Sequence, residues 1–284
     1  MQPAIFRLNF DIELRHWWFA ARRRILRDLV AEVLPPRRDT ILVDVGCGTG
    51  GNVGGLAESY ACVGIDPSPD AVALARSRFR HVRFVCGQAP GDLGPVVRKA
   101  RLFLMTDVLE HVRDDRAMLA RWVAAASPGA YFLVTVPADK ALWGRHDENH
   151  GHYRRYDEAE LHRVWADLPI APRLVSYFNA RLHPLVKLVR TASRWLGIGC
   201  GRAGTDLAVP LPLVNRVLEW TFAGEGKVLK DLLQGKRCRG YCRGVSLIAL
   251  ICKTPVIPLV DWPEGSPTTR QPPVTVRPAA PFAA

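Results

Sequence analysis

The sequence lacks any hydrophobic run long enough to cross a bilayer. No stretch of its 284 residues reaches the roughly 18 consecutive apolar residues that a membrane-spanning helix needs. We expect no secretion signal either, because Arg7, Asp11, Glu13 and Arg15 interrupt the amino-terminal stretch. There is no internal repeat, and 48% apolar with 23% charged residues exclude a disordered, collagen-like or coiled-coil chain. We therefore expect a globular protein of the cytoplasm.

The number of cysteines is odd, whereas a disulfide framework pairs an even number. Of the seven cysteines, three lie in apolar, strand-like runs: Cys62, Cys86 and Cys252. This pattern predicts reduced thiols in a cytosolic compartment. Cys200, Cys238 and Cys242 do not have the C-x2-C spacing of common zinc sites and no histidine lies nearby, so we expect no metal there.

Acidic residues are in the minority. There are 27 Asp and Glu against 39 Lys and Arg, which leaves a net charge of +12. Segment 179–243 alone holds twelve basic and four acidic residues, and so carries eight of those net charges. The excess favours an anionic partner, such as a phospholipid surface, a phosphorylated substrate or nucleic acid. Nucleic acid is the least favoured of these, because no aromatic-basic strand motif or recognition helix occurs.

Apolar runs alternate with amphipathic segments along most of the chain. Strands are predicted at 41–45, 61–65, 82–86, 101–106, 131–136, 172–178 and 244–252, and helices at 12–34, 52–59, 67–78, 114–126 and 157–165. This alternation predicts an α/β fold, doubly wound, with a parallel sheet covered by helices on both faces. Residues 138–156 read as a polar loop rich in His and Arg.

Changes in composition divide the chain into three parts. Residues 1–38 are predicted to form an amino-terminal lid helix, and 39–252 the α/β domain. Within that domain, 179–243 is expected to form a basic helical insert before the last strand. Residues 253–284 contain eight prolines and are expected to be a disordered tail.

A glycine turn follows the first predicted strand. Asp44 precedes Gly46, Gly48 and Gly50, and a helix is expected next. Glycines allow a sharp turn and the close approach of a ligand, and a helix start offers free N–H groups. Asp66 ends the second strand 20 residues after Gly46, where a carboxylate can hold both hydroxyls of a ribose.

Two classes of ligand fit this turn. Gly46-x-Gly48-x-x-Gly51 satisfies the dinucleotide fingerprint, so an NAD(P)-dependent oxidoreductase is one alternative. A methyl donor instead carries an ammonium and a sulfonium group, which the acidic Asp44 suits, whereas Asp44 would repel a diphosphate. A donor-binding fold without catalytic activity, serving as a partner protein, is the third alternative.

Three stretches together carry a family pattern: DVGCGTG at 44–50, GIDPSPDAV at 64–72 and DVLEHVRDD at 107–115. With them the chain resembles the class I S-adenosylmethionine-dependent methyltransferases over 40–136 and the returning strand 244–252. The resemblance implies a Rossmann-like, mostly parallel sheet of seven strands whose last strand is antiparallel. It also implies S-adenosyl-L-methionine as cofactor and methyl transfer to an acceptor by in-line displacement.

Further stretches narrow the resemblance. They are HWWFAARRRIL at 16–26, LWGRHDENHGHYRRY at 142–156, and PLPLVNRVLEW at 210–220 with GVSLIAL at 244–250. These look like a bacterial subgroup whose members are often linked to the assembly of cell-surface polysaccharide or glycolipid. A lipid-linked or sugar-linked acceptor follows from that link as an expectation.

The resemblance also implies roles for single residues. Asp44, Gly46, Gly48 and Gly50 would line the methionine part of the donor, with Cys47 contributing its backbone.

Other residues would surround the adenosine. Asp66 would hold the ribose, and Pro67 would lie against the adenine. Gln88 and Ala89 stand where the family usually has Asp and Ala, and the Gln88 carbonyl can still accept from an amine.

Two more segments are expected at the donor. Asp107 and Val108 end the fourth strand, at the edge where ligands gather in such sheets. Trp18 and Arg22 combine an indole with a guanidinium, which suits a lid over a nucleotide-like ligand.

The candidate general bases are histidines. A base is needed only if the acceptor carries a proton on the attacking atom. His111, His146 and His152 are the predicted catalytic residues, and His150 is a further candidate. A zinc site made of His146, His150 and His152 is conceivable, but the family does not call for one, and no metal is predicted.

The insert contains a basic amphipathic pattern. One helical stripe holds Leu182, Leu185, Val189 and Leu196, and another holds Lys187, Arg190 and Arg194, with Trp195 beside them and a second apolar piece at Leu211–Phe222. Such a helix suits peripheral contact of 182–222 with anionic lipid, at the inner face of the membrane. The alternative is an ordinary helical cap that its Lys and Arg side chains solvate.

Overall fold

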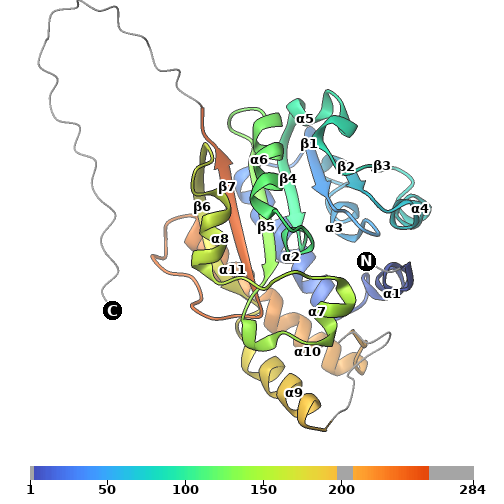
Figure 1. The fold of residues 1–284 in the computed structure, drawn as a ribbon, viewed down its shortest axis with the longest axis vertical. Coiled ribbons are helices and arrows are strands. Elements are labelled where there is room, and N and C mark those ends of the chain that lie inside the picture. Colours follow the sequence, from blue (N-terminus) through green and yellow to red (C-terminus); the bar gives the residue numbers. More distant parts are fainter. Residues whose placement is uncertain (1–2, 197–206, 256–284) are drawn as a thin grey trace, which may run out of the picture.

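The structure is a computed structural model that describes residues 3–196 and 207–255. Its centre is a seven-stranded sheet in the order β3-β2-β1-β4-β5-β7-β6 (Figure 1). The strands are β1 (Arg37–Val45), β2 (Tyr60–Asp66), β3 (Arg83–Cys86), β4 (Ala100–Thr106), β5 (Tyr131–Pro137), β6 (Ile170–Phe178) and β7 (Ser246–Lys253). Only β7 runs antiparallel to its neighbours, β5 and β6. The predicted sheet is confirmed in strand number, mostly parallel direction and antiparallel last strand.

Helices cover both faces of this sheet. They are α1 (Pro3–Ile12), α2 (Trp17–Val33), α3 (Gly51–Gly54), α4 (Pro69–Arg78), α5 (Val96–Lys99), α6 (Asp115–Ala125), α7 (Arg145–His150), α8 (Glu158–Trp165), α9 (His183–Leu196), α10 (Pro212–Ala223) and α11 (Glu225–Leu233). Short 3-10 turns are η1 (Pro90–Leu93), η2 (Leu109–His111) and η3 (Lys140–Leu142). The side chains of Ser68, Asp114 and Asp157 cap α4, α6 and α8, close to the predicted starts.

Four predicted segments need correction. The single helix at 12–34 is two helices, because the chain turns at 13–16 and His16 caps α2 by accepting from the Trp18 N–H. The helix at 52–59 is one turn long, since Gly54 and Gly55 weaken its continuation. The polar loop at 138–156 contains η3 and α7. The predicted disordered tail at 253–284 begins too early, because Lys253 belongs to β7, and its residues 256–284 lie outside the described residues.

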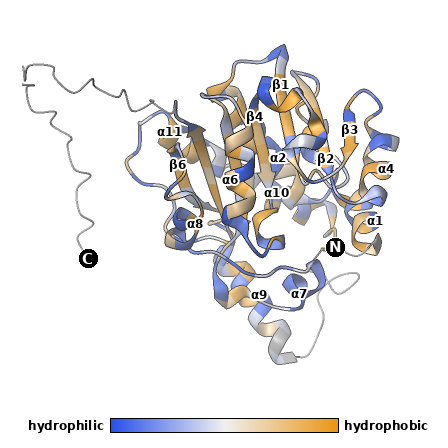
Figure 2. Cartoon of the chain, turned by 45° about the horizontal axis from the view of Figure 1, so that its top comes forward, coloured by the Kyte–Doolittle hydropathy of each residue, from blue (hydrophilic) through white to orange (hydrophobic). Residues whose placement is uncertain are grey.

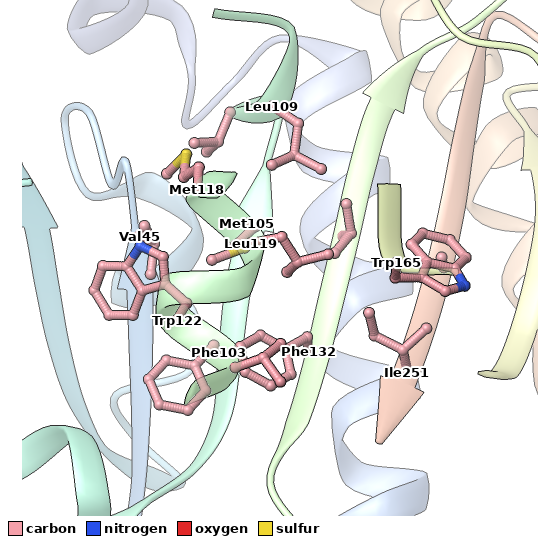
Figure 3. Close-up of a cluster of buried hydrophobic side chains, with 14 of the residues drawn as sticks. Val45, Phe103, Met105, Leu109, Met118, Leu119, Trp122, Phe132, Trp165 and Ile251 are labelled. Atoms are coloured by element: carbon pink, nitrogen blue, oxygen red, sulfur yellow. The ribbon is translucent and has the colours of Figure 1, made fainter. Parts of the chain in front are cut away.

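The core consists of two apolar layers on opposite faces of the sheet. Along each strand alternate side chains point to alternate faces. Phe103 and Phe132 stack 4.9 Å apart on the face covered by α6 and α8, beside Trp122 and Trp165 (Figure 3). The other face packs against α2, α10 and α11. The central strands are mostly hydrophobic, whereas α7 at the lower edge is hydrophilic (Figure 2).

The carboxyl ends of β1, β2, β4 and β5 meet at one edge of the sheet, below which α7 and α9 lie (Figure 1). The insert between β6 and β7 forms α9, α10 and α11, and α10 and α11 pack against α2. Over the described ranges, every helix is too short or too polar to cross a membrane.

Candidate functional site

A cavity of about 1240 Å³ opens at the carboxyl edge of the sheet. It is lined by most of the predicted site residues: Trp18, Arg22, Gly46, Cys47, Gly48, Asp66, Pro67, Gln88, Asp107, Val108, His111, His146 and His152. Three predicted residues do not line it: Asp44, Gly50 and Ala89. The glycine turn and the histidine loop therefore line the same cavity, although they lie about 100 residues apart in the sequence.

The glycine turn is held by the acid that ends β2. Gly46 and Gly48 have φ of +68° and +53°, which glycine adopts without strain. The Asp66 carboxylate accepts from the Gly48 N–H and the Ser68 N–H, both at 2.9 Å. Gly50 serves packing, because a Cβ there would lie 2.9 Å from the Phe84 ring. Asp66 is thus tied to the turn and still borders the cavity.

Asp44 lies behind the turn as an unpaired buried acid. It is 1% exposed, and no described residue makes a hydrogen bond to either carboxyl oxygen. Burial raises the pKa of Asp44 to about 7, although the Arg22 guanidinium acts in the opposite direction. A buried carboxylate without a partner costs free energy, so this position favours a nearby cation.

Glu13 is a site residue for which the sequence offered no signal. It lies in the turn between α1 and α2, lines the cavity and accepts from the Thr49 hydroxyl at 2.8 Å and the Arg78 guanidinium at 2.5 Å. Burial raises its pKa despite these partners. Gly51 leaves room for the carboxylate, because a Cβ there would collide with it. No local motif marks Glu13, since its partners are distant in the sequence.

The first turns of α2 close over the end of β4. Arg22 pairs with the Asp107 carboxylate and lies 4.1 Å from the centre of the Trp18 ring. Asp107 has a φ of +57° and also accepts from the Thr135 hydroxyl at 3.1 Å. The buried Arg22 of α2 therefore joins the amino-terminal helix to the end of β4.

The four histidines lie close together on η2, α7 and the loop after α7. The rings of His111 and His152 are 4.7 Å apart, and those of His146 and His150 are 4.2 Å apart. Burial lowers the pKa of His111 to about 3 and holds that of His146 well below its usual value. Both rings are therefore neutral at neutral pH.

An ion pair orients one of these rings. His152 Nδ1 lies 2.9 Å from Asp147 Oδ1, and the Arg155 guanidinium lies 2.9 Å from the same oxygen. Burial would raise the pKa of Asp147, but these two partners outweigh it and lower the pKa. Asp147 therefore remains a carboxylate, and the His152 proton lies on Nδ1, which leaves Nε2 free.

The fold and the site define a class of protein. A glycine turn after β1 and an acid at the end of β2, at the switch edge of a doubly wound sheet, form a nucleoside-binding site. The chain belongs to the methyltransferase domain family, whose model matches residues 18–168.

Curated relatives agree with the family. A trans-aconitate 2-methyltransferase of Delftia acidovorans is 26% identical over 235 residues, which are 75% of this chain and 78% of that protein. Another, of Deinococcus radiodurans, is 29% identical over 136 residues, 46% of this chain and 51% of that protein.

Solved structures share the fold. The plantazolicin methyltransferase BpumL, solved with SAH, has a TM-score of 0.53 at 11% identity, covering 89% of this chain and 90% of its own. The methyltransferase solved with the Haloferax volcanii Trm112 activator has a TM-score of 0.52 at 15% identity, with coverages of 89% and 96%. The predictions of fold class, of a methyltransferase and of S-adenosylmethionine as cofactor are confirmed. The oxidoreductase alternative is set aside.

Proposed function

We propose that this methyltransferase acts on an anionic acceptor with an apolar tail, such as a lipid-linked sugar or phosphate at the inner membrane face. The observation that carries this proposal is the exposed apolar surface of α9 and α10, the two helices that also form part of the cavity wall. S-adenosylmethionine would occupy the end of the cavity at the glycine turn, and the acceptor the end at the histidines.

The residues at the glycine turn fit the methyl donor. Asp66 borders the cavity where a ribose would lie, with Pro67 and Gln88 beside it for the adenine. Gly46 leaves no room for a side chain, because a Cβ would lie 2.8 Å from Val108. The unpaired carboxyl of Asp44 supplies the negative charge that the donor's ammonium and sulfonium groups require.

The reaction demands little acid–base chemistry from the chain. When bound, S-adenosylmethionine supplies a methyl group already activated by its positive sulfur. Arg22 and Asp107 hold the lid helix against the end of β4, which positions the cavity wall and excludes water. An anionic acceptor needs no base, whereas a hydroxyl acceptor would pass its proton to one of the predicted bases His111, His146 and His152, which all line the cavity.

The acceptor end joins the exposed surface. Leu185 and Val189 of α9 line the cavity and are 48% and 45% exposed, so they lie at its opening. Further large apolar side chains on α9, on α10 and just before α10 are between 54% and 87% exposed: Leu188, Trp195, Leu211, Leu213, Val217 and Trp220. Large apolar groups exposed together on neighbouring elements mark an interaction site.

The predicted stripes on α9 need correction. Leu182 is buried and packs in the core rather than on a surface stripe. Lys187 lies 3.5 Å from Asp139, and Arg190 donates to the Leu142 carbonyl at 2.7 Å, so both reach toward the body of the protein. Half-exposed Lys187 and exposed Arg216 still place positive charge beside the apolar surface. The side chains of Arg194 and Leu196 lie outside the described residues.

Vesicle binding tests the membrane part of the proposal. We expect the protein to cosediment with vesicles that contain anionic phospholipid, and not with vesicles of zwitterionic lipid alone. The double variant Leu188→Glu and Trp220→Glu should lower this binding about tenfold, since two apolar anchors are replaced by like charges. Leu14→Glu is the matched control, because Leu14 is 52% exposed outside α9 and α10. Equal sedimentation with both vesicle types would contradict the proposal.

A small carboxylate acceptor is the second candidate, because two relatives are named for trans-aconitate and cationic side chains, among them Arg121, Arg145 and Arg155, line the cavity. Incorporation of labelled methyl groups from S-adenosylmethionine distinguishes the two candidate acceptors. Methyl transfer to trans-aconitate in the absence of vesicles would favour the small carboxylate acceptor. Methyl transfer only to lipid extract incorporated into vesicles would support the lipid-linked acceptor.

The lid contact gives a further expected outcome. Arg22→Ala should weaken binding of S-adenosylhomocysteine about tenfold, because the buried ion pair with Asp107 and the stacking on Trp18 are both lost. Arg24→Ala changes an exposed arginine of the same helix and should leave the affinity unchanged. Calorimetric titration measures both, and equal affinities would remove Arg22 from the donor site.

A further inference from the structure

Three side chains at the acceptor end of the cavity form a ligand set that the motifs did not predict. A carboxylate oxygen of Glu110 and one ring nitrogen each of His111 and His152 all lie within 4.8 Å of one another. All three residues line the cavity. We propose that Glu110, His111 and His152 bind a divalent first-row transition metal ion, such as zinc, manganese or cobalt.

Glu110 supplies the observation that points to a cation. It is 0% exposed, and within the described part of the chain neither carboxyl oxygen has a hydrogen-bond partner. Two unsatisfied buried carboxyl oxygens are costly, and a structure retains them where something compensates. A bound cation would be that compensation, since it would meet the carboxylate directly.

The two histidines present their rings to the same point. His111 follows Glu110 directly on η2, and His152 comes from the loop after α7, with the two rings 4.7 Å apart in an edge-to-face arrangement. The Tyr153 N–H donates to the Glu110 carbonyl at 2.7 Å, which ties the two segments together. The three ligands are therefore held in place by the packing of η2 against the loop after α7.

His152 also has the outer partner typical of a metal-binding histidine. Its Nδ1 lies against the Asp147 carboxylate, which Arg155 holds in turn, and Nε2 remains for the ion. A carboxylate behind a ligating imidazole orients the ring and raises its basicity.

The distances and donors define the class of ion. Two ligands of one tetrahedral zinc ion lie about 3.3 Å apart, so the ligand atoms of this set, which lie within 4.8 Å of one another, must draw together by as much as about 1.5 Å. Two imidazoles and one carboxylate suit transition ions better than calcium or magnesium, which prefer oxygen ligands only. The remaining coordination positions would open to the cavity, where an oxygen of the acceptor could bind.

Cobalt binding tests the site on the full chain, with absorption and calorimetry as readouts that do not need methyl transfer. After treatment with a chelator, the protein should bind one Co²⁺ with visible d–d bands and without a thiolate charge-transfer band, and Zn²⁺ should displace it. Glu110→Gln and His152→Ala should each weaken this binding about 100-fold. His81→Ala, which changes an exposed histidine outside the cavity, is the matched control and should bind like the parent protein.

Glu110→Gln keeps the shape of the side chain and removes a buried charge, so it should fold even if His152→Ala does not. A Co²⁺-induced rise in Tm in the parent protein that disappears in Glu110→Gln supports the site. A thiolate charge-transfer band would assign the ion to the exposed Cys238 and Cys242 and overturn the proposal. Absence of binding, or equal binding in Glu110→Gln, would overturn it as well.

Discussion

Replacing Asp66 by alanine is expected to lower the affinity for S-adenosylmethionine and S-adenosylhomocysteine about 100-fold. Two charge-assisted hydrogen bonds to the ribose would be lost, each worth about 1.5–3 kcal/mol. The same carboxylate holds the Gly48 and Ser68 N–H groups, so the glycine turn would also loosen. Calorimetric titration of the purified variant with both ligands measures the loss.

Two further variants separate the ribose contact from the turn. Asp66→Asn keeps one acceptor oxygen for the glycine turn, so its Tm should be closer to that of the parent protein than the Tm of Asp66→Ala. It should still bind both adenosyl ligands weakly. Asp70→Ala removes an exposed acid in the first turn of α4 and should bind normally. Parent-like affinity in Asp66→Ala would show that the ribose lies elsewhere, and binding of NAD⁺ by the parent protein would contradict the donor assignment.

Replacing Asp44 by asparagine is expected to have two opposite effects. The variant should bind S-adenosylmethionine about 30-fold more weakly at pH 8, because it lacks the negative charge behind the glycine turn that would attract the donor's cationic groups. The apoprotein should nevertheless be more stable, because an unpaired buried carboxylate is removed. A fall in affinity together with a rise in Tm distinguishes a functional charge from a structural one.

The effect on stability has a defined pH dependence. The pKa of Asp44 is about 7 in the folded protein, raised by burial from its ordinary value of 3.8. Asp44 therefore does not destabilise the folded protein below pH 3.8. Its destabilising effect grows as the pH rises and is complete above about pH 7. The gain in Tm of Asp44→Asn should be larger at pH 8 than at pH 5.

The affinity for S-adenosylmethionine also depends on the ionisation of Asp44, but it should rise with pH whereas the stability falls. Donor binding favours ionised Asp44, so the parent protein should lose affinity as the pH falls below about 7. Asp39→Asn changes an exposed acid at the start of β1 and should show neither effect. A pH-independent affinity in the parent protein would argue against a charge contact between Asp44 and the donor.

The donor end of the site could be predicted because its parts are local. Asp44, the glycines after it and Asp66 lie at strand ends, and the parallel order of β1 and β2 brings such ends together. Gly46 and Gly48 must be glycines for backbone reasons alone, which a sequence displays directly. Asp44, Gly50 and Ala89 belong to the same motifs but do not line the cavity, since a motif does not state which member packs and which binds.

Site residues that depend on contacts between distant segments could not be predicted in the same way. Glu13 reaches Thr49 only because the chain turns between α1 and α2, and no periodicity marks that turn. Glu110 and His152 come together through the packing of η2 against the loop after α7. The amphipathic pattern of 182–222 indicated an interfacial segment, but it did not reveal that Leu182 belongs to the core.

The sequence by itself determined the order of the strands, the glycine turn after β1 and the acid at the end of β2. These depend on apolar periodicity and on backbone conformations that particular residues allow, and both act over a few neighbouring positions. Only the tertiary structure decided which side chains share the cavity, which acids are left unpaired and which apolar residues stay exposed. Those properties depend on distances between segments far apart in the chain, and burial together with the partners of each group then determines the cost of its charge.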